Sequence, residues 1–170
     1  MKIATWNVNS IKSRLGSVLA WLEAAKPDVL CLQEIKCQTA DFPALEIQAL
    51  GYHVEALGQR SYNGVALLSR RPFAAVRRGL AGDAADEQAR YIEADIDGLC
   101  VASLYLPNGN PVASEKYPYK LRWMERLEVH AAALLESERV FVLAGDYNIC
   151  PSDEDVYDPV AWREDALCRH

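Results

Sequence analysis

Two short apolar runs constrain the fold of this 170-residue chain more than any other feature. Residues 28–33 read DVLCLQ and residues 140–144 read VFVLA. Each run is shorter than a typical helix and alternates little between polar and apolar residues, so each predicts a strand buried on both faces. Buried strands of this kind need covering layers, which indicates sheets packed with helices.

Apolar periodicity in the rest of the chain predicts a single domain over residues 1–170 that mixes helices and strands. Helices are expected around Leu15–Leu22 before Pro27, over Phe42–Leu50 before Gly51, and from Leu121 through Met124, Leu127 and Ala131 to Leu134. Further strands are expected over Lys2–Asn7, Tyr52–Leu57, Gly64–Ser69, Phe73–Arg78, Tyr91–Ile96 and Cys100–Leu106. This mixture indicates an α/β or α+β fold.

Charge and cysteine content narrow the function classes only in part. The net charge of −6 argues at first against a nucleic-acid partner, but such binding depends on local patches. Basic clusters at residues 70–78 and 116–126 are each interpreted as solvated surface when taken alone. The five cysteines are scattered without a CxxC pair, which predicts reduced thiols rather than a disulfide framework or a zinc site.

The chain shows no membrane signal. It has no run of about 18 apolar residues. Its N-terminal residues are too polar for the apolar region of a signal peptide. The sequence therefore predicts a cytoplasmic protein, and a monomer is expected because no extended apolar helix face is left for pairing.

Polar residues directly follow three of the predicted strands. Asn7 ends the first strand, the Gln33–Glu34 pair stands at the end of the first apolar run, and Asp146 with Asn148 follows the second. Ligand sites in α/β sheets lie at such carboxyl ends. Carboxylate and amide oxygens suit Mg²⁺ or Mn²⁺ rather than zinc or copper. Such a metal can stabilise charge on a phosphoryl oxygen.

Taken singly, each of these residues has an ordinary structural explanation. Asn7 can be a turn residue, Glu34 a helix cap or surface carboxylate, and Asp146 and Asn148 caps of the turn after their strand. Tyr105 alone would be a sheet aromatic. Only the joint pattern points to a site.

In combination, five ordered motifs resemble the exodeoxyribonuclease III branch of the endonuclease/exonuclease/phosphatase superfamily. They span nearly the whole chain and are Ala4–Asn9 (ATWNVN), Leu32–Lys36 (LQEIK), Asn63–Ser69 (NGVALLS), Tyr105–Gly109 (YLPNG) and Gly145–Ile149 (GDYNI). The resemblance implies a four-layer α/β/β/α sandwich of two mixed sheets flanked by helices.

The resemblance also implies roles for individual residues. Tyr105 would contact the scissile phosphate, Asp146 would orient or deprotonate the attacking water, and Asn148 would hold the water or phosphate. Glu34, with Asn7, Asp146 and Asn148 beside it, would hold a catalytic Mg²⁺, which Mn²⁺ could replace. The expected DNA contacts are Asn9, Lys36, Arg90, Asn108 and Lys120, although a structural salt bridge explains Arg90 equally well.

The chain departs from the family pattern at its C-terminal end. Family members continue with further strands and a motif in which an Asp precedes the catalytic His, which residues 165–170 (DALCRH) do not match. That role is assigned to none of His53, His130 and His170. The expectation is a sandwich that is incomplete at the C-terminus, with an exposed apolar face, an unpaired edge, poor stability in isolation and an incomplete site.

The resemblance implies a DNA phosphodiester hydrolase of base-excision repair. Its substrate would be double-stranded DNA, degraded from 3′ ends or cleaved 5′ to abasic sites. Two alternatives stay open, a superfamily phosphatase acting on a phospholipid or inositol phosphate and a catalytically incomplete DNA-binding fragment. The motifs at residues 63–65 and 105–109 favour the DNA branch.

Overall fold

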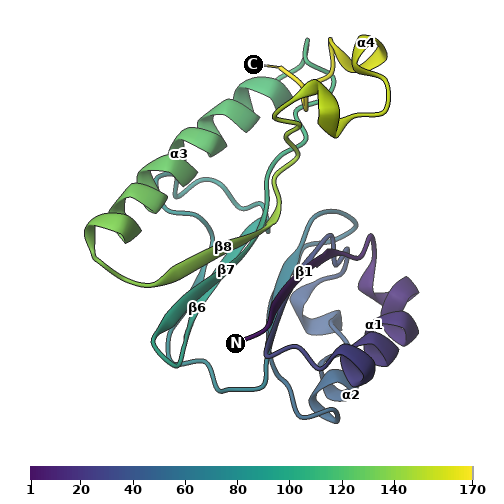
Figure 1. Ribbon diagram of the computed structural model, residues 1–170, viewed down its shortest axis with the longest axis vertical. Helices are drawn as coiled ribbons and strands as arrows, with labels where there is room; N and C mark the ends of the chain where they lie inside the picture. Colours follow the sequence, from purple (N-terminus) through teal and green to yellow (C-terminus); the bar gives the residue numbers. More distant parts are fainter. Residues whose placement is uncertain (170) are drawn as a thin grey trace.

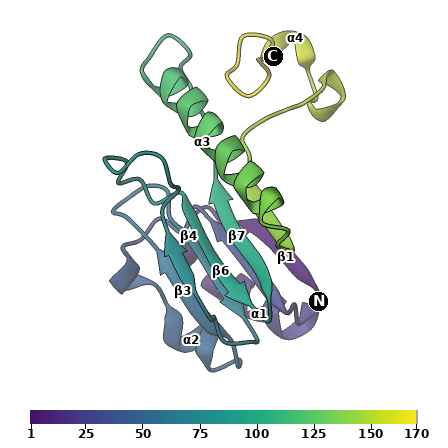
Figure 2. The ribbon, with the colours of Figure 1, turned by 90° about the vertical axis from the view of Figure 1, so that its left-hand side faces the viewer.

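The computed structural model describes residues 1–169 and consists of two four-stranded sheets packed face to face, with helices on both outer sides (Figure 1). The first sheet contains, in spatial order, β1 (Ile3–Asn7), β2 (Val29–Gln33), β4 (Val65–Ser69) and β3 (His53–Leu57). The second contains β5 (Val76–Arg78), β6 (Tyr91–Ile96), β7 (Leu99–Tyr105) and β8 (Phe141–Asp146). α1 (Ile11–Ala25) and α2 (Ala44–Gln48) cover the first sheet, and α3 (Lys116–Glu136) covers the second (Figures 1 and 2). The predicted α/β/β/α arrangement is confirmed.

Each sheet combines one parallel strand pair with antiparallel pairs. β1 runs parallel to β2, with Asn7 opposite Gln33, and β7 runs parallel to β8, with Tyr105 opposite Asp146. All other pairings are antiparallel. Parallel neighbours need a long crossover connection, and α1 and α3 provide it in the two sheets.

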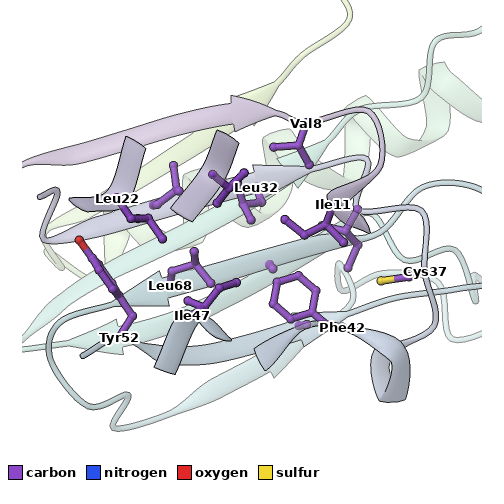
Figure 3. Close-up of a cluster of buried hydrophobic side chains, with 14 residues drawn as sticks. Val8, Ile11, Leu22, Leu32, Cys37, Phe42, Ile47, Tyr52 and Leu68 are labelled. Carbon is purple, nitrogen blue, oxygen red and sulfur yellow. The ribbon is translucent and has the colours of Figure 1, made fainter. Parts of the chain in front are cut away.

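Three groups of buried side chains hold the layers together. One lies between the sheets, one between the first sheet and its helices (Figure 3), and one between the second sheet and α3. Their largest fully buried members are Trp123, Tyr91, Ile11, Leu22, Leu30, Leu32, Ile35, Ile47, Leu67, Leu68, Ile92 and Ile96. Full burial of one aliphatic side chain contributes about 1.5–3 kcal/mol, so these groups are the main source of stability.

α2 is shorter than the sequence predicted. It covers Ala44–Gln48 rather than Phe42–Leu50. A proline disfavours the helical conformation of the residue before it. Phe42, which precedes Pro43, is accordingly extended, with φ −68° and ψ 133°. The helix therefore begins only after the proline.

The predicted apolar stripe of α3 is confirmed in part. Leu127 and Leu134 are buried and Met124 and Ala131 are half-buried, but Leu121 is 42% exposed. The buried face also includes Lys120, Trp123 and His130, which the stripe left out. Two polar residues can lie on the buried face because both find hydrogen-bond partners there. Within residues 1–169, no helix combines the length and the apolarity needed to cross a membrane.

β8 differs from the central strands in its burial. Every residue of β8 is half-buried, whereas every residue of β2 and β4 is buried. Within residues 1–169, β8 pairs only with β7 and forms the edge of its sheet. Val140, just before β8, is 70% exposed. An edge of this kind leaves backbone groups open to a further strand.

Candidate active site

The carboxyl ends of the two parallel strand pairs meet across the sandwich. Asn7 ends β1 beside Gln33 of β2, and Tyr105 ends β7 beside Asp146 of β8. Glu34 follows β2 directly. β1 packs against β8 and β2 against β7, so the strand ends of one sheet face those of the other. The fold thus gathers polar side chains that are far apart in the sequence.

Hydrogen bonds join the side chains at these strand ends. The Asn7 Nδ2 group donates to Glu34 Oε1 and to Asp146 Oδ2, at 2.9 Å each. The Tyr105 hydroxyl donates to Glu34 Oε1 at 3.0 Å. These bonds link the two sheets. We call Asn7, Glu34, Tyr105 and Asp146 the strand-end cluster.

Glu34 carries a negative charge in this cluster. The Lys36 Nζ atom lies 2.8 Å from Glu34 Oε2. Partial burial acts to raise the pKa of Glu34, but hydrogen bonds from Asn7, Lys36 and Tyr105 and the Lys36 charge outweigh it, so the pKa lies below its ordinary value. The carboxylate is therefore ionised at neutral pH.

Tyr105 keeps its proton at neutral pH. Burial, followed by the Glu34 carboxylate, raises the pKa of Tyr105 to about 12. The Arg90 guanidinium lies 4.9 Å from the centre of the Tyr105 ring and acts in the opposite direction. Arg90 also donates to the Tyr105 carbonyl at 3.2 Å and to Gln88 Oε1 at 2.7 Å. Among the described residues Arg90 forms no salt bridge, and cation–π contact takes its place.

The backbone beside the cluster is left-handed at several non-glycine residues. The φ angles of Asn9, Glu34, Lys36 and Asn148 are 43°, 51°, 50° and 46°. Such conformations cost roughly 1–3 kcal/mol each and persist only where the surroundings fix them. The turns after β1, β2 and β8 therefore have the uncommon geometry that is typical of functional sites.

Asn148 lies beside the cluster, but its side chain is directed to a neighbouring loop. Its backbone N–H donates to Asp146 Oδ1 at 3.0 Å, and its Nδ2 group donates to the Leu106 carbonyl at 2.8 Å. The structure joins Asn7, Glu34 and Asp146 by side-chain hydrogen bonds, whereas the Asn148 side chain bonds to Leu106 and Asn108, so its place in a metal site stays a prediction. Its role beside a water or phosphate stays a prediction.

The residues expected to contact DNA lie in different environments. Lys36 binds Glu34 and donates to Asn9 Oδ1, so both Lys36 and Asn9 border the cluster. Asn108 is exposed on the loop after β7. Lys120, in contrast, is 2% exposed, and within residues 1–169 its Nζ atom binds backbone carbonyls alone. The prediction that Lys120 contacts DNA is wrong because this side chain is buried.

The arginines of residues 70–78 are occupied by neighbouring side chains. Their partners are Tyr52 for Arg70, Asp97 for Arg71, Glu93 for Arg77 and Glu55 for Arg78. The three carboxylates offset the charges of Arg71, Arg77 and Arg78, while Arg70 lies over the neutral Tyr52 ring. The sequence interpretation as ordinary surface agrees with this arrangement.

Three polar residues near the cluster had no role assigned from sequence. Gln33 Nε2 donates to Ser103 Oγ at 3.0 Å, and Ser103 Oγ donates to the Leu32 carbonyl at 2.9 Å. Thr5 Oγ1 donates to Gln33 Oε1 at 3.2 Å. Gln33 and Ser103 are buried. The sequence feature that could have pointed to these three residues is their polarity within otherwise apolar strands.

The strand-end cluster fits a magnesium ion. Glu34 and Asp146 supply two carboxylates, both bound to the Asn7 amide. Mg²⁺ takes one or two protein carboxylates and keeps several waters. Within residues 1–169, no group of three or more His, Cys, Asp or Glu side chains gathers for a metal ion, so an ion here would have few protein ligands.

Neither described histidine reaches the cluster. His53 is the exposed first residue of β3. His130 lies on the buried face of α3, with Nε2 at 2.7 Å from Glu93 Oε2. His170 lies outside the described residues.

Comparison with known proteins identifies the family of this chain. Residues 4–167 match the Endonuclease/Exonuclease/phosphatase family. The chain belongs to this family, which confirms the resemblance carried by the five motifs. Among curated relatives, Exodeoxyribonuclease III of Haemophilus influenzae is 36% identical over 161 residues, which is 92% of this chain and 60% of the relative. Exodeoxyribonuclease of Bacillus subtilis is 28% identical over 98% of this chain and 66% of its own length.

Solved structures of similar proteins have the same fold. An AP endonuclease from Archaeoglobus fulgidus superimposes with a TM-score of 0.93 at 41% identity, covering 98% of this chain and 65% of that chain. A 3′-5′ exonuclease, NExo, from Neisseria meningitidis gives 0.93 at 42% identity, with 99% and 66% covered. A Neisseria NExo described as a 3′ phosphatase, bound to a product DNA hairpin, gives 0.90 at 41% identity, with 95% and 63% covered. The chain spans less than two thirds of the length of these relatives.

Proposed function

We propose that this chain carries part of the active site of a Mg²⁺-dependent hydrolase that cleaves phosphodiester bonds of double-stranded DNA in base-excision repair. The reactions would be 3′→5′ removal of nucleotides and cleavage 5′ to abasic sites. One observation carries the proposal, namely the strand-end cluster in which Asn7 binds carboxylates from both sheets. The nuclease and AP endonuclease names of similar proteins support the same substrate.

Asp146 is the residue of the cluster best suited to act on the attacking water. Its carboxylate accepts hydrogen bonds from Asn7 and from the Asn148 backbone, and neither donor is a cation. A carboxylate within hydrogen-bond reach of a water can take its proton. Tyr105, which is protonated at neutral pH, can donate to a phosphoryl oxygen.

Glu34 would hold the metal with Asp146, and Asn7 would fix the two carboxylates relative to each other. The bound ion, Mg²⁺ or Mn²⁺ in its place, would stabilise negative charge on the phosphoryl oxygens. Lys36 keeps Glu34 ionised and oriented through its contact at 2.8 Å.

Residues beside the cluster would bind the DNA backbone. Asn9 and Asn108 are exposed, and Lys36 and Arg90 are half-buried next to Glu34 and Tyr105. Contacts to phosphate position DNA without reading its sequence. Recognition of a missing base would then rely on groove shape and backbone deformability.

The test is cleavage of a duplex that carries one abasic-site analogue, with Mg²⁺ and with EDTA. The wild-type chain is compared with a Glu34→Ala/Asp146→Ala double variant, which excludes a contaminating nuclease. Metal-dependent cleavage that the double variant loses supports the proposal. Retained DNA binding without cleavage by a folded chain would instead favour the non-catalytic DNA-binding alternative.

A further inference from the structure

Lys120 is a buried lysine that joins three separate segments of the chain. It lies near the start of α3 and is 2% exposed. Its Nζ atom donates to the carbonyl oxygens of Asn148 at 2.7 Å, Ala166 at 2.9 Å and Asn108 at 3.3 Å. Asn108 belongs to the loop after β7 and Asn148 to the loop after β8, while Ala166 lies in the C-terminal segment.

The Lys120 ammonium group is hydrogen-bonded to these carbonyls instead of being paired with a carboxylate. Buried lysines are normally paired with a carboxylate. In the part of the chain that the structure describes, Lys120 forms no salt bridge, and its three N–H donors meet three carbonyl oxygens. Burial lowers the pKa of Lys120, although nearby Asp165 acts against this shift. The three hydrogen bonds offset the cost of desolvating the ammonium group and connect α3 to three other segments.

The loop after β7 is shaped around the lysine stem. Gly109 has φ +87°, and a Cβ atom at this position would lie 2.8 Å from Lys120 Cδ and 3.1 Å from the Ala166 side chain. Any larger residue would therefore be strained and would push against the stem. The glycine leaves the space in which Lys120 passes under the loop.

The contact with Asn148 connects Lys120 to the strand-end cluster. Lys120 binds the carbonyl of Asn148, while the N–H of Asn148 donates to Asp146 Oδ1 at 3.0 Å. Asn148 has the left-handed φ of 46°, which needs support from its surroundings. Asn148 is thus fixed from both sides.

We propose that Lys120 is a positioning residue, which sets the loops after β7 and β8 and thereby orients Asn148 and Asp146 for the reaction. The inference rests on the proposed function, because it assigns Lys120 an effect on that reaction. Lys120 acts through Asn148 and does not touch the substrate. Small displacements of catalytic groups can cost up to about 10²-fold in rate.

The kinetic test compares Lys120→Met with Lys116→Met on duplex DNA carrying an abasic-site analogue. Methionine keeps much of the stem volume but removes the three donors, and Lys116 is an exposed lysine on the same helix. We expect Lys120→Met to lower kcat by about 10- to 100-fold with KM changed less than about two-fold, and Lys116→Met to leave both unchanged. A Lys120→Met chain that unfolds at lower temperature but keeps its kcat would overturn the proposal.

A third variant separates charge from geometry. Lys120→Arg keeps the positive charge, but its planar guanidinium cannot direct three donors as a compact ammonium does. We expect its kcat to stay below that of the wild type. Full kcat in Lys120→Arg would show that charge alone is sufficient and that the three-point contact does not position the loops.

An NMR measurement tests the contact without any activity. In the wild-type chain labelled with ¹⁵N-lysine, the buried Lys120 ammonium is expected to give a slowly exchanging signal that Lys116→Met retains and Lys120→Met loses. Absence of that signal from the folded wild type refutes the three-carbonyl contact whatever the activity. A signal from a wild-type chain that does not cleave DNA would establish the contact. It would refute the proposed function in this chain, and with it the effect of Lys120 on the reaction.

Discussion

Glu34 and Asp146 reach the same Asn7 amide from opposite sheets, yet their surroundings differ. Glu34 follows the fully buried β2 and accepts hydrogen bonds from Asn7, Tyr105 and Lys36. Asp146 ends the half-buried β8 and accepts hydrogen bonds from Asn7 and from a backbone N–H.

This difference indicates that the two carboxylates have different roles in the proposed reaction. Pairs of titratable groups whose environments differ commonly take different roles in catalysis. Glu34 is bound by a cation and a phenol, so it is suited to a fixed, ionised ligand role. Asp146 contacts no cation within residues 1–169 and is suited to handle a proton. Four sets of substitutions can break or sharpen this comparison.

The largest effect is expected at the two carboxylates themselves. Asp146→Asn removes a proton acceptor as well as a metal ligand, so we expect kcat to stay about 10²–10⁴-fold below the wild type even at saturating Mg²⁺. Glu34→Gln weakens a metal ligand, so its lost activity should be partly restored as Mg²⁺ is raised. Cleavage rates over a Mg²⁺ titration test both. Equal recovery of the two variants at high Mg²⁺ would contradict separate roles.

The next effect concerns the residue before each carboxylate. Gln33 precedes Glu34, whereas Gly145 precedes Asp146, and a Cβ atom on Gly145 would lie 2.0 Å from the Leu104 carbonyl oxygen. Gly145→Ala should therefore force β7 and β8 apart and lower the free energy of unfolding by about 3 kcal/mol.

Gly16 offers a matched control for this substitution. An added Cβ on Gly16, within α1, meets nothing within 4 Å. Gly16→Ala should stabilise the chain by about 0.5–1 kcal/mol. Urea denaturation of both variants makes the comparison, and equal stability of the two would show that β8 tolerates a side chain at this position.

A smaller effect is expected at the buried contact between the sheets. Ser103→Ala leaves the buried Gln33 amide without its acceptor, which should cost about 2 kcal/mol in the free energy of unfolding. The double variant Gln33→Leu/Ser103→Ala removes both partners and should recover much of this loss. A double-mutant cycle by urea denaturation measures the coupling. Additive losses would show that this contact does not join the sheets.

The smallest effect is a shift in the titration of Glu34. Tyr105→Phe removes one donor, so the pKa of Glu34 should rise toward its ordinary value. Because the folded pKa is lowered, Glu34 stabilises the wild type above the unfolded value of about 4.3, and this contribution is lost as pH falls through the folded pKa. Carboxyl ¹³C NMR titration measures the shift, with Tyr62→Phe at an exposed position as control. An unchanged pKa in Tyr105→Phe would contradict the hydrogen bond.

The positions of the strand-end residues could be predicted from sequence, but their partners could not. Apolar runs show where β2 and β8 end, which places Glu34 and Asp146 near strand ends. The hydrogen bond from Asn7 to Asp146 depends on how two sheets stack, and no local pattern contains that information.

Lys120 shows why sequence reasoning failed for one residue. A lysine on an amphipathic helix was interpreted as facing solvent and DNA. Lys120 lies three residues before Trp123 and seven before Leu127, which places it on the buried face of α3. A search for helical periodicity that was not limited to apolar residues would have predicted its burial. Its carbonyl partners come from loops whose paths depend on the complete fold.

The strand register determines which changes in length the site can absorb. Asn7 stays opposite Gln33 because β1 and β2 are hydrogen-bonded along their length, whatever connects them. The crossover that contains α1 can therefore gain or lose residues during evolution without separating these two strand ends. One residue inserted inside β2 would turn each following side chain to the opposite face. Related chains should accordingly vary in their connections and conserve the lengths of the strands that carry the cluster.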